Sequence, residues 1–561
     1  MDYDTDALVV GAGPTGLVMA SELARNGVQC RIIDRLPQGS RESKALSIHA
    51  RTLELFEKMG IVDSFLARGI KIKRLSVYSH HRCIAHVDTR SIPSRYPFML
   101  SLPQTETEHI LSEHLLRQGL EVEREVTLAG LRQVNDGVEV LLQYADGQEE
   151  QLYTRWLVGC DGPHSSVRHL LGMDFVGVKF EQSFALADIY LDWYMPPQQA
   201  TFFLQNGEFV GCFPLPDSLH RIIVAYKAGT APEGIVTQEE IQYALERSGL
   251  KEARVRDMLW SSRFQVSQRK VRHYRQGSVF LAGDACHIHS PIAGQGMNTG
   301  IQDAFNLAWK LALTCKHEVS PRVLDSYEVE REHVGRKLLR GTELISRLVL
   351  AHDSLPSRVR DHVAPLLSNN NFIRKQLANT ISQVQIAYKH SPIVHDQQPK
   401  SLYSPLQEGE RRQAGERAPD IHILLGNTPM RLYVLCRSTH HVLLVFTNRQ
   451  QPDQDLEIWG KLDTLIKQKY RDLIDAYLIL PRQPGIKDSG RTRAIYDAHE
   501  AIYATYGIAN NGLVLIRPDG YIAYLDHSIE LKPFQSYLNN IFTVGQPQPA
   551  NIFSRALLRK R

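Results

Sequence analysis

The feature that most constrains the fold of this chain is a glycine-rich turn near its start. The turn reads Gly11-Ala12-Gly13-Pro14-Thr15-Gly16, follows the apolar run Ala7–Val10, and precedes apolar residues at helical spacing from Leu17 to Ala24. A GxGxxG sequence between a strand and a helix is typical of a βαβ unit that binds a dinucleotide. Its first glycine permits the tight turn, the second lets a pyrophosphate approach the backbone, and the third allows the helix to pack closely on the strand. The sequence therefore predicts a dinucleotide site at the start of this helix.

An acidic residue follows where such a site needs one. Gly27 ends the helix, the extended run Cys30–Ile33 follows, and Asp34 closes it, with Arg35 next. A carboxylate at the end of the second strand can bind the hydroxyls of an adenosine ribose, and Arg35 is a further candidate for cofactor contact. The acid serves the ribose of NAD and of FAD equally, so this motif does not separate the two. The alternative is an ordinary glycine turn with no ligand.

Composition and charge exclude several other classes of protein. A length of 561 residues predicts two to four domains at ~150 residues each. With 43% hydrophobic and 22% charged residues the chain reads as globular, and a net charge of +4 is too small to indicate nucleic acid binding. We find neither a signal peptide nor an apolar run long enough to span a bilayer, which predicts a cytoplasmic protein without membrane attachment. The seven cysteines form no CxxC pair and no metal spacing, so we expect a reducing compartment and no metal.

Two downstream segments repeat the pattern of a glycine and an aspartate at the end of a strand. The segment from Gly159 to Arg168, which contains Asp161, follows the apolar residues Trp156–Val158. The segment Gly283-Asp284-Ala285-Cys286-His287 follows Val279–Leu281. Both aspartates, together with Gly283, are therefore candidates for the same cofactor site.

A helix start lies a few residues beyond the second of these segments. Pro291 fixes the chain, Gly294 and Gly296 leave backbone N–H groups unobstructed, and the helix is predicted to begin near Met297 and Asn298. The positive end of that helix could face a developing anion, such as a reduced flavin, and would stabilise it. The alternative is a tight turn capped by Asn298.

Together these three turns resemble the class A FAD-dependent aromatic hydroxylases, the single-component flavoprotein monooxygenases related to para-hydroxybenzoate hydroxylase and phenol hydroxylase. The resemblance covers roughly residues 5 to 345, and its most specific stretch is GDACHIHSPIAGQGMNTGIQDAFNLAWKL. It implies that Asp284 binds the ribityl or ribose region of FAD. It also implies that Asp161 belongs to a motif shared between FAD and the nicotinamide cofactor.

The resemblance adds candidates in two further segments. Gln104 with Glu108 matches the Q-x-x-x-E helix start of the family, whose glutamine contacts the flavin. The same segment could be a helix start without a ligand, with acids near its positive end, and we favour that interpretation for Glu108. Where relatives have an arginine beside the pyrophosphate, this chain offers Lys44 or, three residues earlier, Arg41. A solvated basic loop is the alternative for both.

The function that the resemblance implies is monooxygenation. NAD(P)H would reduce FAD, O2 would form a flavin C4a-hydroperoxide, and its distal hydroxyl would pass to a small-molecule aromatic or polycyclic substrate of phenolic, polyketide or antibiotic type. No catalytic acid or base can be named. Two alternatives stay open: an FAD-dependent reductase or dehydrogenase of the same fold that inserts no oxygen, and a flavin-binding regulatory protein.

The predicted fold class is α/β. A Rossmann-like FAD-binding domain, with the βαβ unit of glutathione reductase, is expected at residues 1–76, 100–178 and 266–345. A β-sheet substrate domain is interleaved at 77–99 and 179–265, where Phe202, Phe203, Phe209 and Phe213 either cover the flavin or form plain sheet core. A helical connector is expected at 346–400.

The last block, residues 401–561, resembles the thioredoxin-like extension of phenol and polyketide hydroxylases. Its apolar runs predict strands at Arg431–Leu435, Val442–Phe446, Ala476–Leu480 and Leu513–Ile516. Its only cysteine is Cys436, so thiol exchange would have no resolving partner. We therefore expect this domain to have a structural role or to form a homo-oligomer.

Overall fold

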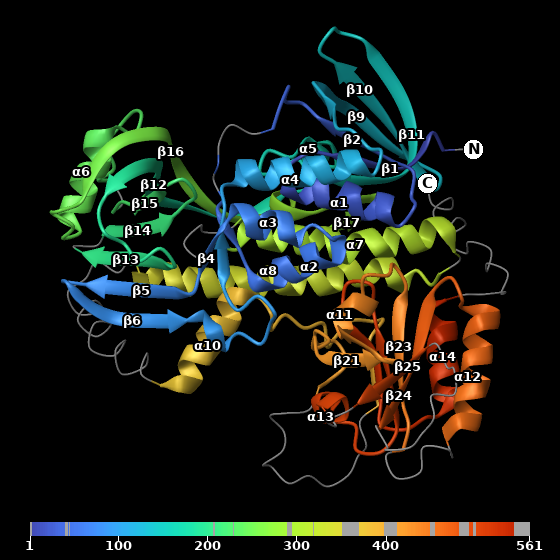
Figure 1. Ribbon diagram of the computed structural model, residues 1–561. Helices are drawn as coiled ribbons and strands as arrows, with labels where there is room; N and C mark the ends of the chain where they lie inside the picture. The colour runs from blue at the N-terminus through green and yellow to red at the C-terminus, as the bar shows by residue number, and fades with distance from the viewer. Residues whose placement is uncertain are drawn as a thin grey trace.

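The computed structural model describes most of the chain, drawn as coloured ribbon in Figure 1. The described residues are 3–39, 43, 45–205, 208–227, 229–288, 294–317, 319–349, 370–397, 412–448, 455–481, 493–497 and 501–542. They form three sheet-bearing parts, with the long helices α7 (Gly296–Lys316) and α8 (Arg322–Val349) running across the middle of the molecule (Figure 1). The α/β fold class predicted from the sequence is confirmed.

The first sheet has a parallel core of four strands in the order β18-β11-β1-β2. Val10 of β1 pairs with both Gly159 of β11 and Ile33 of β2, and Gly159 pairs with Leu281 of β18. The carboxyl ends of these strands therefore meet at one edge. The strands of this sheet are β1 (Thr5–Val10), β2 (Cys30–Asp34), β8 (Glu123–Arg124), β9 (Val126–Val134), β10 (Gly137–Tyr144), β11 (Glu149–Gly159), β17 (Arg275–Gln276) and β18 (Val279–Leu281).

Glycines let the helices of this domain pack very closely. A Cβ atom at Gly16 of α1 (Pro14–Arg25) would lie 1.8 Å from the carbonyl oxygen of Gly11. A Cβ atom at Gly300 of α7 would lie 2.3 Å from Oγ1 of Thr15, so the Thr15 side chain is wedged between α1 and α7. The packing role predicted for the third glycine of the motif is thus visible in the structure. The other helices of this domain are α2 (Ala50–Met59), α3 (Val62–Arg68), α4 (Gln104–Arg117) and α5 (Ser166–Leu170).

The second sheet has the strand order β19-β16-β12-β15-β14-β13-β5-β6. Its outer face packs on α6 (Gln238–Arg247) through Ile241, Ala244 and Leu245. Its inner face packs on Leu46 and Met99, which belong to the first domain, around the small sheet β3-β7-β4. The strands are β5 (Arg74–Ser79), β6 (Arg82–Asp88), β12 (Phe175–Asp192), β13 (Gln199–Gln205), β14 (Glu208–Pro214), β15 (Leu219–Ala225), β16 (Arg254–Val271) and β19 (His287–Ile288), with β3 (Ser47–Ile48), β4 (Ile70–Ile72) and β7 (Met99–Ser101) in the small sheet and the short helices η1 (Thr89–Ser91) and η2 (Gly283–Ala285) nearby.

The aromatic residues of this sheet lie on both faces. Phe202, Phe209 and Phe213 pack in the inner cluster. Phe203 packs in the outer cluster with Val210 and Val224, because side chains alternate between faces along a strand. Phe203 is therefore plain sheet core, one of the two interpretations that the sequence left open, and it lies on the opposite face from the other three phenylalanines.

The C-terminal part is an α/β domain, which lies against α7 and α8 (Figure 1). Its core strand order is β24-β23-β26-β27, in which β23 and β24 are parallel and β26 and β27 form an antiparallel hairpin. Helix α12 connects the parallel pair and α14 follows the hairpin, which is the connectivity of the thioredoxin fold. The elements are β21 (His422–Leu425), β22 (Thr428–Arg431), α11 (Leu432–Leu435), β23 (His441–Phe446), α12 (Leu456–Lys469), β24 (Ile474–Pro481), β25 (Ala494–Asp497), α13 (Ala501–Tyr506), β26 (Gly512–Ile516), β27 (Ile522–Asp526) and α14 (Leu531–Ile541), and in the connector α10 (Asn371–Ser382) and β20 (His395–Gln397).

Three of the four strands predicted in this domain are confirmed. The fourth, at Arg431–Leu435, is wrong: β22 ends at Arg431 and the next residues form the helical turn α11. The run is apolar because Leu432, Tyr433 and Leu435 are buried, and a short apolar run does not distinguish a strand from a buried helical turn. Among the described residues, none of the helices has the length and apolar character needed to cross a membrane.

Candidate flavin site

The three glycine and aspartate turns meet at the carboxyl edge of the parallel sheet. A Cβ atom at Gly11 would lie 2.6 Å from the carbonyl oxygen of Cys160 and 2.7 Å from Cα of Asp161. A Cβ atom at Gly283 would lie 2.7 Å from Oγ1 of Thr15. Gly11 and Gly283 have φ angles of +100° and +64°, which side chains disfavour. The structure thus brings together three segments that are far apart in the sequence.

The start of helix α1 offers room and donors for an anion. A Cβ atom at Gly13 would meet no heavy atom within 4 Å, in contrast to the crowded Gly11 and Gly16. Gly13 is the N-cap of α1 and Pro14 opens the helix, and no side chain caps it. Unsatisfied N–H groups and the helix dipole make such an end suitable for a phosphate group.

Asp34 lies beside this turn. Its Oδ2 accepts a hydrogen bond of 2.7 Å from the Ala12 backbone N–H, and its Oδ1 accepts one of 2.8 Å from that of Leu36. These bonds fix the carboxylate at the end of β2, next to the glycine turn, while each oxygen keeps a further lone pair for a ribose hydroxyl. Arg35 is exposed immediately after it.

Asp161 joins the second turn to helix α5. Its Oδ2 accepts hydrogen bonds from the backbone N–H groups of Ser166 at 2.6 Å and Val167 at 3.2 Å. Its Oδ1 is buried without a hydrogen-bond partner among the described residues. Burial raises the pKa of this carboxyl group, against the lowering effect of its hydrogen bonds. Arg168 then links α5 to the third turn by donating to the carbonyl oxygen of Ala285 at 3.1 Å.

The third turn is held from beneath by a buried carboxylate that the sequence analysis did not single out. Asp303 accepts hydrogen bonds from the Gly283 N–H at 3.0 Å, from His287 at 2.8 Å and from Arg331 at 2.5 Å. Burial would raise the pKa of Asp303, but the cation of Arg331 and the His287 ring lower it below its ordinary value. Asp284 itself is exposed at the turn. Asp303 is therefore an anchor for the turn.

The helix start at Gly294–Asn298 is fastened to the loop that precedes α2. The buried Asn298 side chain donates to the carbonyl oxygens of Ser47 at 2.7 Å and Gly294 at 3.1 Å. Its Oδ1 accepts from the His49 N–H at 2.9 Å and from Thr52 Oγ1 at 2.7 Å. Asn298 thus positions this turn with its side chain. Gly296 begins α7 without a side-chain cap, and Met297 is partly buried beside it.

His49 is a second residue that the sequence analysis missed. It is buried, and its Nε2 lies 3.0 Å from the carbonyl oxygen of Gly294, to which it donates. Burial lowers the pKa of the His49 imidazole to about 4, so the ring is neutral near pH 7. A histidine that precedes an amphipathic helix carries no motif, so the sequence offered no signal for this contact.

Gln104 lies at the start of α4, against the loop before β3. Its Oε1 accepts from the Ala45 N–H at 3.1 Å, and its Nε2 donates to Glu108 at 2.8 Å. Gln104 thus opens the predicted helix, and both of these hydrogen bonds are made within the protein. Three other candidates, Arg41, Lys44 and Pro291, lie outside the described residues.

One charged pair interrupts the apolar inner face of the second sheet. The buried Arg221 side chain donates two hydrogen bonds of 2.7 Å to Asp188, and its guanidinium lies 5.2 Å from the ring centroid of Trp260. Phe213 pairs with Arg221 on the neighbouring strand. The Nη1 atom of Arg221 is buried without a hydrogen-bond partner among the described residues. Because this buried N–H group has no partner among the described residues, it can donate a hydrogen bond to a ligand.

The residues present at the sheet edge fit FAD. The open space beside Gly13 and the uncapped start of α1 suit a pyrophosphate. The uncapped start of α7 suits an anionic ring, and the carboxylate at the end of β2 suits a ribose. Among the described residues we find no group of histidine, cysteine and acidic side chains that could hold a metal ion.

The comparison with known families agrees with this geometry. The family model described as "FAD binding domain" matches residues 4–342, and the model described as "Aromatic-ring hydroxylase, C-terminal" matches residues 411–545. The chain therefore belongs to the family of FAD-binding aromatic-ring hydroxylases. It is an FAD-dependent monooxygenase that takes its electrons from NAD(P)H.

Individual relatives resemble it over nearly the whole chain. Pentachlorophenol 4-monooxygenase from Sphingobium chlorophenolicum is 31% identical, over 92% of this chain and 93% of the relative. A 6-methylpretetramide 4-monooxygenase from Streptomyces rimosus is 32% identical, over 92% of this chain and 90% of the relative. The solved structure of an anhydrotetracycline hydroxylase from Streptomyces rimosus superposes with a TM-score of 0.73 at 29% identity, covering 97% of this chain and 100% of the other.

Proposed function

We propose that this monooxygenase uses O2 to hydroxylate an electron-rich aromatic or polycyclic phenol. One observation carries the proposal: three cofactor-type turns meet at one sheet edge, and an apolar sheet face rich in aromatic side chains packs against the adjoining loop. Two relatives are named for pentachlorophenol, a phenol of one ring, and for 6-methylpretetramide, a polycyclic compound. When bound, FAD supplies the redox chemistry of the reaction.

The chain's own residues then hold and shield the cofactor. We assign the pyrophosphate to the turn Gly11–Gly16 with Pro14 and Thr15, and the adenosine ribose to Asp34 with Arg35 beside it. We assign the ribityl region to Gly283 and Asp284, and the flavin ring to the helix start at Gly294–Asn298. Asp161 and Gln104 complete this proposed set, as do the sequence candidates Arg41, Lys44 and Pro291. The domain limits predicted from the sequence are part of the same proposal.

The inner face of the second sheet would bind the substrate. Its aliphatic and aromatic side chains exclude water, which limits the loss of reducing equivalents to hydrogen peroxide. Arg221, held by Asp188, offers Nη1 as a donor to a phenolic or carbonyl oxygen of the substrate. We expect this one polar contact to orient the substrate ring within otherwise apolar surroundings.

The decisive experiment measures NAD(P)H oxidation by the FAD-loaded protein with a panel of phenols of one to four rings under 18O2. We expect one size class to stimulate oxidation and to acquire a single labelled oxygen. Oxidation of NAD(P)H without label in any product would instead support a reductase. The same panel, run with NADPH and NADH separately, shows which reductant is used.

A substitution tests the substrate site. Arg221→Met keeps an apolar stem of similar length but removes the donor, so KM for the preferred phenol should rise about tenfold while FAD stays bound. Asp188→Asn is the companion variant, because it loosens the guanidinium without removing it and should have the smaller effect. An unchanged KM in the arginine variant would contradict this placement of the substrate.

Oligomerisation through residues 401–561, a cytoplasmic location and the absence of nucleic acid partners stay predictions from the sequence.

A further inference from the structure

Helix α7 carries an unusual buried polar stripe. Asn298, Gln302, Asn306 and Lys310 follow one another at intervals of four residues, so they share one face of the helix. All four are buried, with relative exposures of 0%, 4%, 1% and 0%. The stripe runs from the proposed flavin end of the helix towards its C-terminal half. Polar side chains are expensive to bury unless they are bonded, so their partners are informative.

Hydrogen bonds connect the members of this stripe in two pairs, which the helix backbone joins, and the second pair also bonds to α8. Gln302 donates to the carbonyl oxygen of Asn298 at 3.2 Å. Lys310 donates to Oδ1 of Asn306 at 2.7 Å and to Glu330 at 2.8 Å, and Asn306 donates to the same Glu330 oxygen at 2.6 Å. Burial lowers the pKa of the Lys310 ammonium to about 8, with Glu330 opposing that shift. The C-terminal end of the stripe, Asn306 and Lys310, thus hydrogen-bonds to one buried carboxylate, that of Glu330.

The C-terminal domain supplies a second cation to Glu330, in addition to Lys310. Arg517, in the turn between β26 and β27, donates to both Glu330 oxygens at 2.6 and 2.9 Å and also pairs with Asp519. All three side chains are at most 3% exposed. With Lys310, the cluster holds two cations and two carboxylates, and loss of Arg517 alone would leave two buried carboxylates with a single cation.

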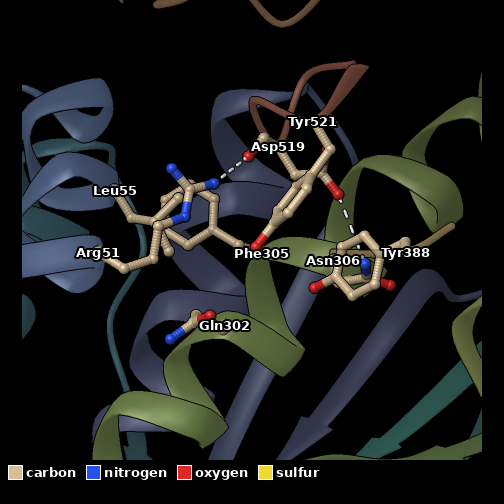
Figure 2. A pocket seen from close by; sticks show the side chains of 8 residues that line it. All are labelled: Arg51, Leu55, Gln302, Phe305, Asn306, Tyr388, Asp519 and Tyr521. Atoms are coloured by element: carbon tan, nitrogen blue, oxygen red, sulfur yellow. Dashed lines mark hydrogen bonds between the residues drawn. The ribbon is translucent and has the colours of Figure 1, made fainter. Parts of the chain in front are cut away.

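The same turn is also held by α2, the helix that His49 precedes. Arg51 donates to the carbonyl oxygen of Asp519 at 2.6 Å, and Lys58 donates to that of Pro518 at 2.5 Å. Figure 2 shows Asp519 between Arg51 and Asn306, with a hydrogen bond to each, in the lining of a small cavity. The cavity is about 10 Å3, the space of a single water molecule, so this junction is almost completely packed.

A second chain of contacts links the turn to the third glycine turn of the cofactor site. Arg331, which anchors Asp303, also donates to the hydroxyl group of Tyr388 at 2.9 Å. The Tyr388 ring lies at a centroid distance of 4.3 Å from the Tyr521 ring and at 44° to it, and the Arg517 guanidinium lies 5.3 Å from the Tyr388 ring centroid. Two routes therefore join residues 517–521 to the third glycine turn and to the helix start at Gly294–Asn298.

We propose that Arg517 and Asp519 of the C-terminal domain are positioning residues for the flavin site. By pairing with Glu330, which also binds Asn306 and Lys310, they fix α7 along its axis, and the helix transmits that placement to Asn298, which fastens the Gly294–Asn298 turn to the loop at Ser47 and His49. The inference rests on the proposed position of the flavin at this helix start. It assigns the C-terminal domain a role within its own chain that needs neither a thiol nor a second subunit.

The test measures the dissociation constant of FAD for the full-length apoprotein, together with the absorption spectrum of the bound flavin. Arg517→Met leaves Glu330 and Asp519 facing Lys310 alone, and should weaken FAD binding about tenfold and shift the flavin absorption bands. Leu478→Ala is the control, because it removes buried apolar volume from the same domain without touching the stripe. At a temperature where both variants are folded by circular dichroism, the control should bind FAD within about twofold of the parent chain.

Two further variants keep the test decisive if Arg517→Met does not fold. Glu330→Gln with Arg517→Met removes both charges of the pair, and should recover part of the FAD affinity and of the parent spectrum. Gln302→Met interrupts the stripe between its ends and should shift the spectrum with the C-terminal turn intact. Equal effects of Arg517→Met and Leu478→Ala, or no effect of Gln302→Met, would overturn the inference.

Asn298→Ala separates this inference from the proposed flavin position. If Asn298→Ala leaves FAD affinity and spectrum unchanged, the flavin does not lie at this helix start and the proposed site is wrong. If Asn298→Ala weakens FAD binding while the Arg517 and Gln302 variants do not, the site stands and only the positioning role fails.

Discussion

At the scale of single residues, His49 links the stability of the protein to pH. Its buried ring donates to the carbonyl oxygen of Gly294, and burial lowers the pKa of the imidazole from 6.5 to about 4. The unfolded chain therefore binds a proton at His49 between pH 6.5 and 4 that the folded chain excludes. The contribution is complete above pH 6.5 and is lost progressively as the pH falls towards 4. Its full size is about 3 kcal/mol.

The prediction is that His49→Gln flattens the acid side of the stability profile. Glutamine keeps an N–H donor for Gly294 but does not titrate, so the loss of unfolding free energy between pH 7 and 5 should be smaller than in the parent chain. Urea unfolding at both pH values measures the difference. His441, whose pKa burial lowers to about 3, is present in both proteins and cancels in the comparison. An identical pH dependence would show that His49 is accessible to protons in the folded state.

At this scale, the sequence predicted those positions where the backbone conformation or the packing requires glycine. Gly11 and Gly283 have positive φ angles, and Gly16 has no room for a side chain, so each leaves a readable trace. His49 and Asp303 leave none, because their roles come from partners that lie far away along the chain or carry no motif. Tertiary hydrogen bonds of ordinary residue types have no local signal.

At the scale of elements, the first strand, turn and helix separate packing from ligand binding. Gly16 is required for packing, since an added Cβ would lie 1.8 Å from the carbonyl oxygen of Gly11, whereas an added Cβ at Gly13 meets open space. Gly16→Ala should lower the unfolding free energy of the apoprotein by about 3 kcal/mol. Gly13→Ala should leave it within about 0.5 kcal/mol but weaken FAD binding at least about tenfold, because the methyl group occupies the space of the pyrophosphate.

Thermal unfolding of the two apoproteins and fluorescence titration with FAD measure both effects. Gly147→Ala, in a turn between β10 and β11 far from the cofactor edge, is a control for FAD affinity. Loss of apoprotein stability in Gly13→Ala would mean that Gly13 also has a packing role. Normal FAD binding by that variant would contradict the proposed pyrophosphate position.

Elements with strong periodicity were predictable, and short ones were not. The helix predicted from the spacing of Leu17 to Ala24 lies within α1 (Pro14–Arg25), and the helix start predicted near Met297 lies one residue earlier, at Gly296. The predicted strand at Arg431–Leu435 was wrong because its apolar run is too short to show a period. The polar stripe of α7 was visible as residue types, but its meaning depends on α8 and on the turn at Arg517.

At the scale of the whole molecule, helices α7 and α8 contribute to the apolar cores of both the flavin domain and the C-terminal domain. Trp309 of α7 and Val323 of α8 are buried in the same cluster as Leu443 of β23 and Phe534 of α14. Most buried apolar residues of α7, Leu311 and Ala312 included, pack in the core of the flavin domain, whereas Trp309 packs in the core of the C-terminal domain. Burial raises the pKa of the Cys436 thiol to about 11, so this group is a neutral thiol near pH 7 and adds no charge to the junction.

Because α7 and α8 contribute to both cores, the two domains should unfold together. We expect calorimetry of the FAD-loaded protein to show one transition, with release of flavin fluorescence within about 2 °C of it. Trp309→Ala removes the largest side chain that α7 contributes to the second core and should cost about 3–5 kcal/mol, so the common transition should fall by several degrees and flavin release should fall with it. Lys461→Ala, on the exposed face of α12, should leave both unchanged. Two separate calorimetric peaks in the parent protein, with flavin released in only one of them, would show that the C-terminal domain is an independent folding unit and that α7 does not couple it to the cofactor.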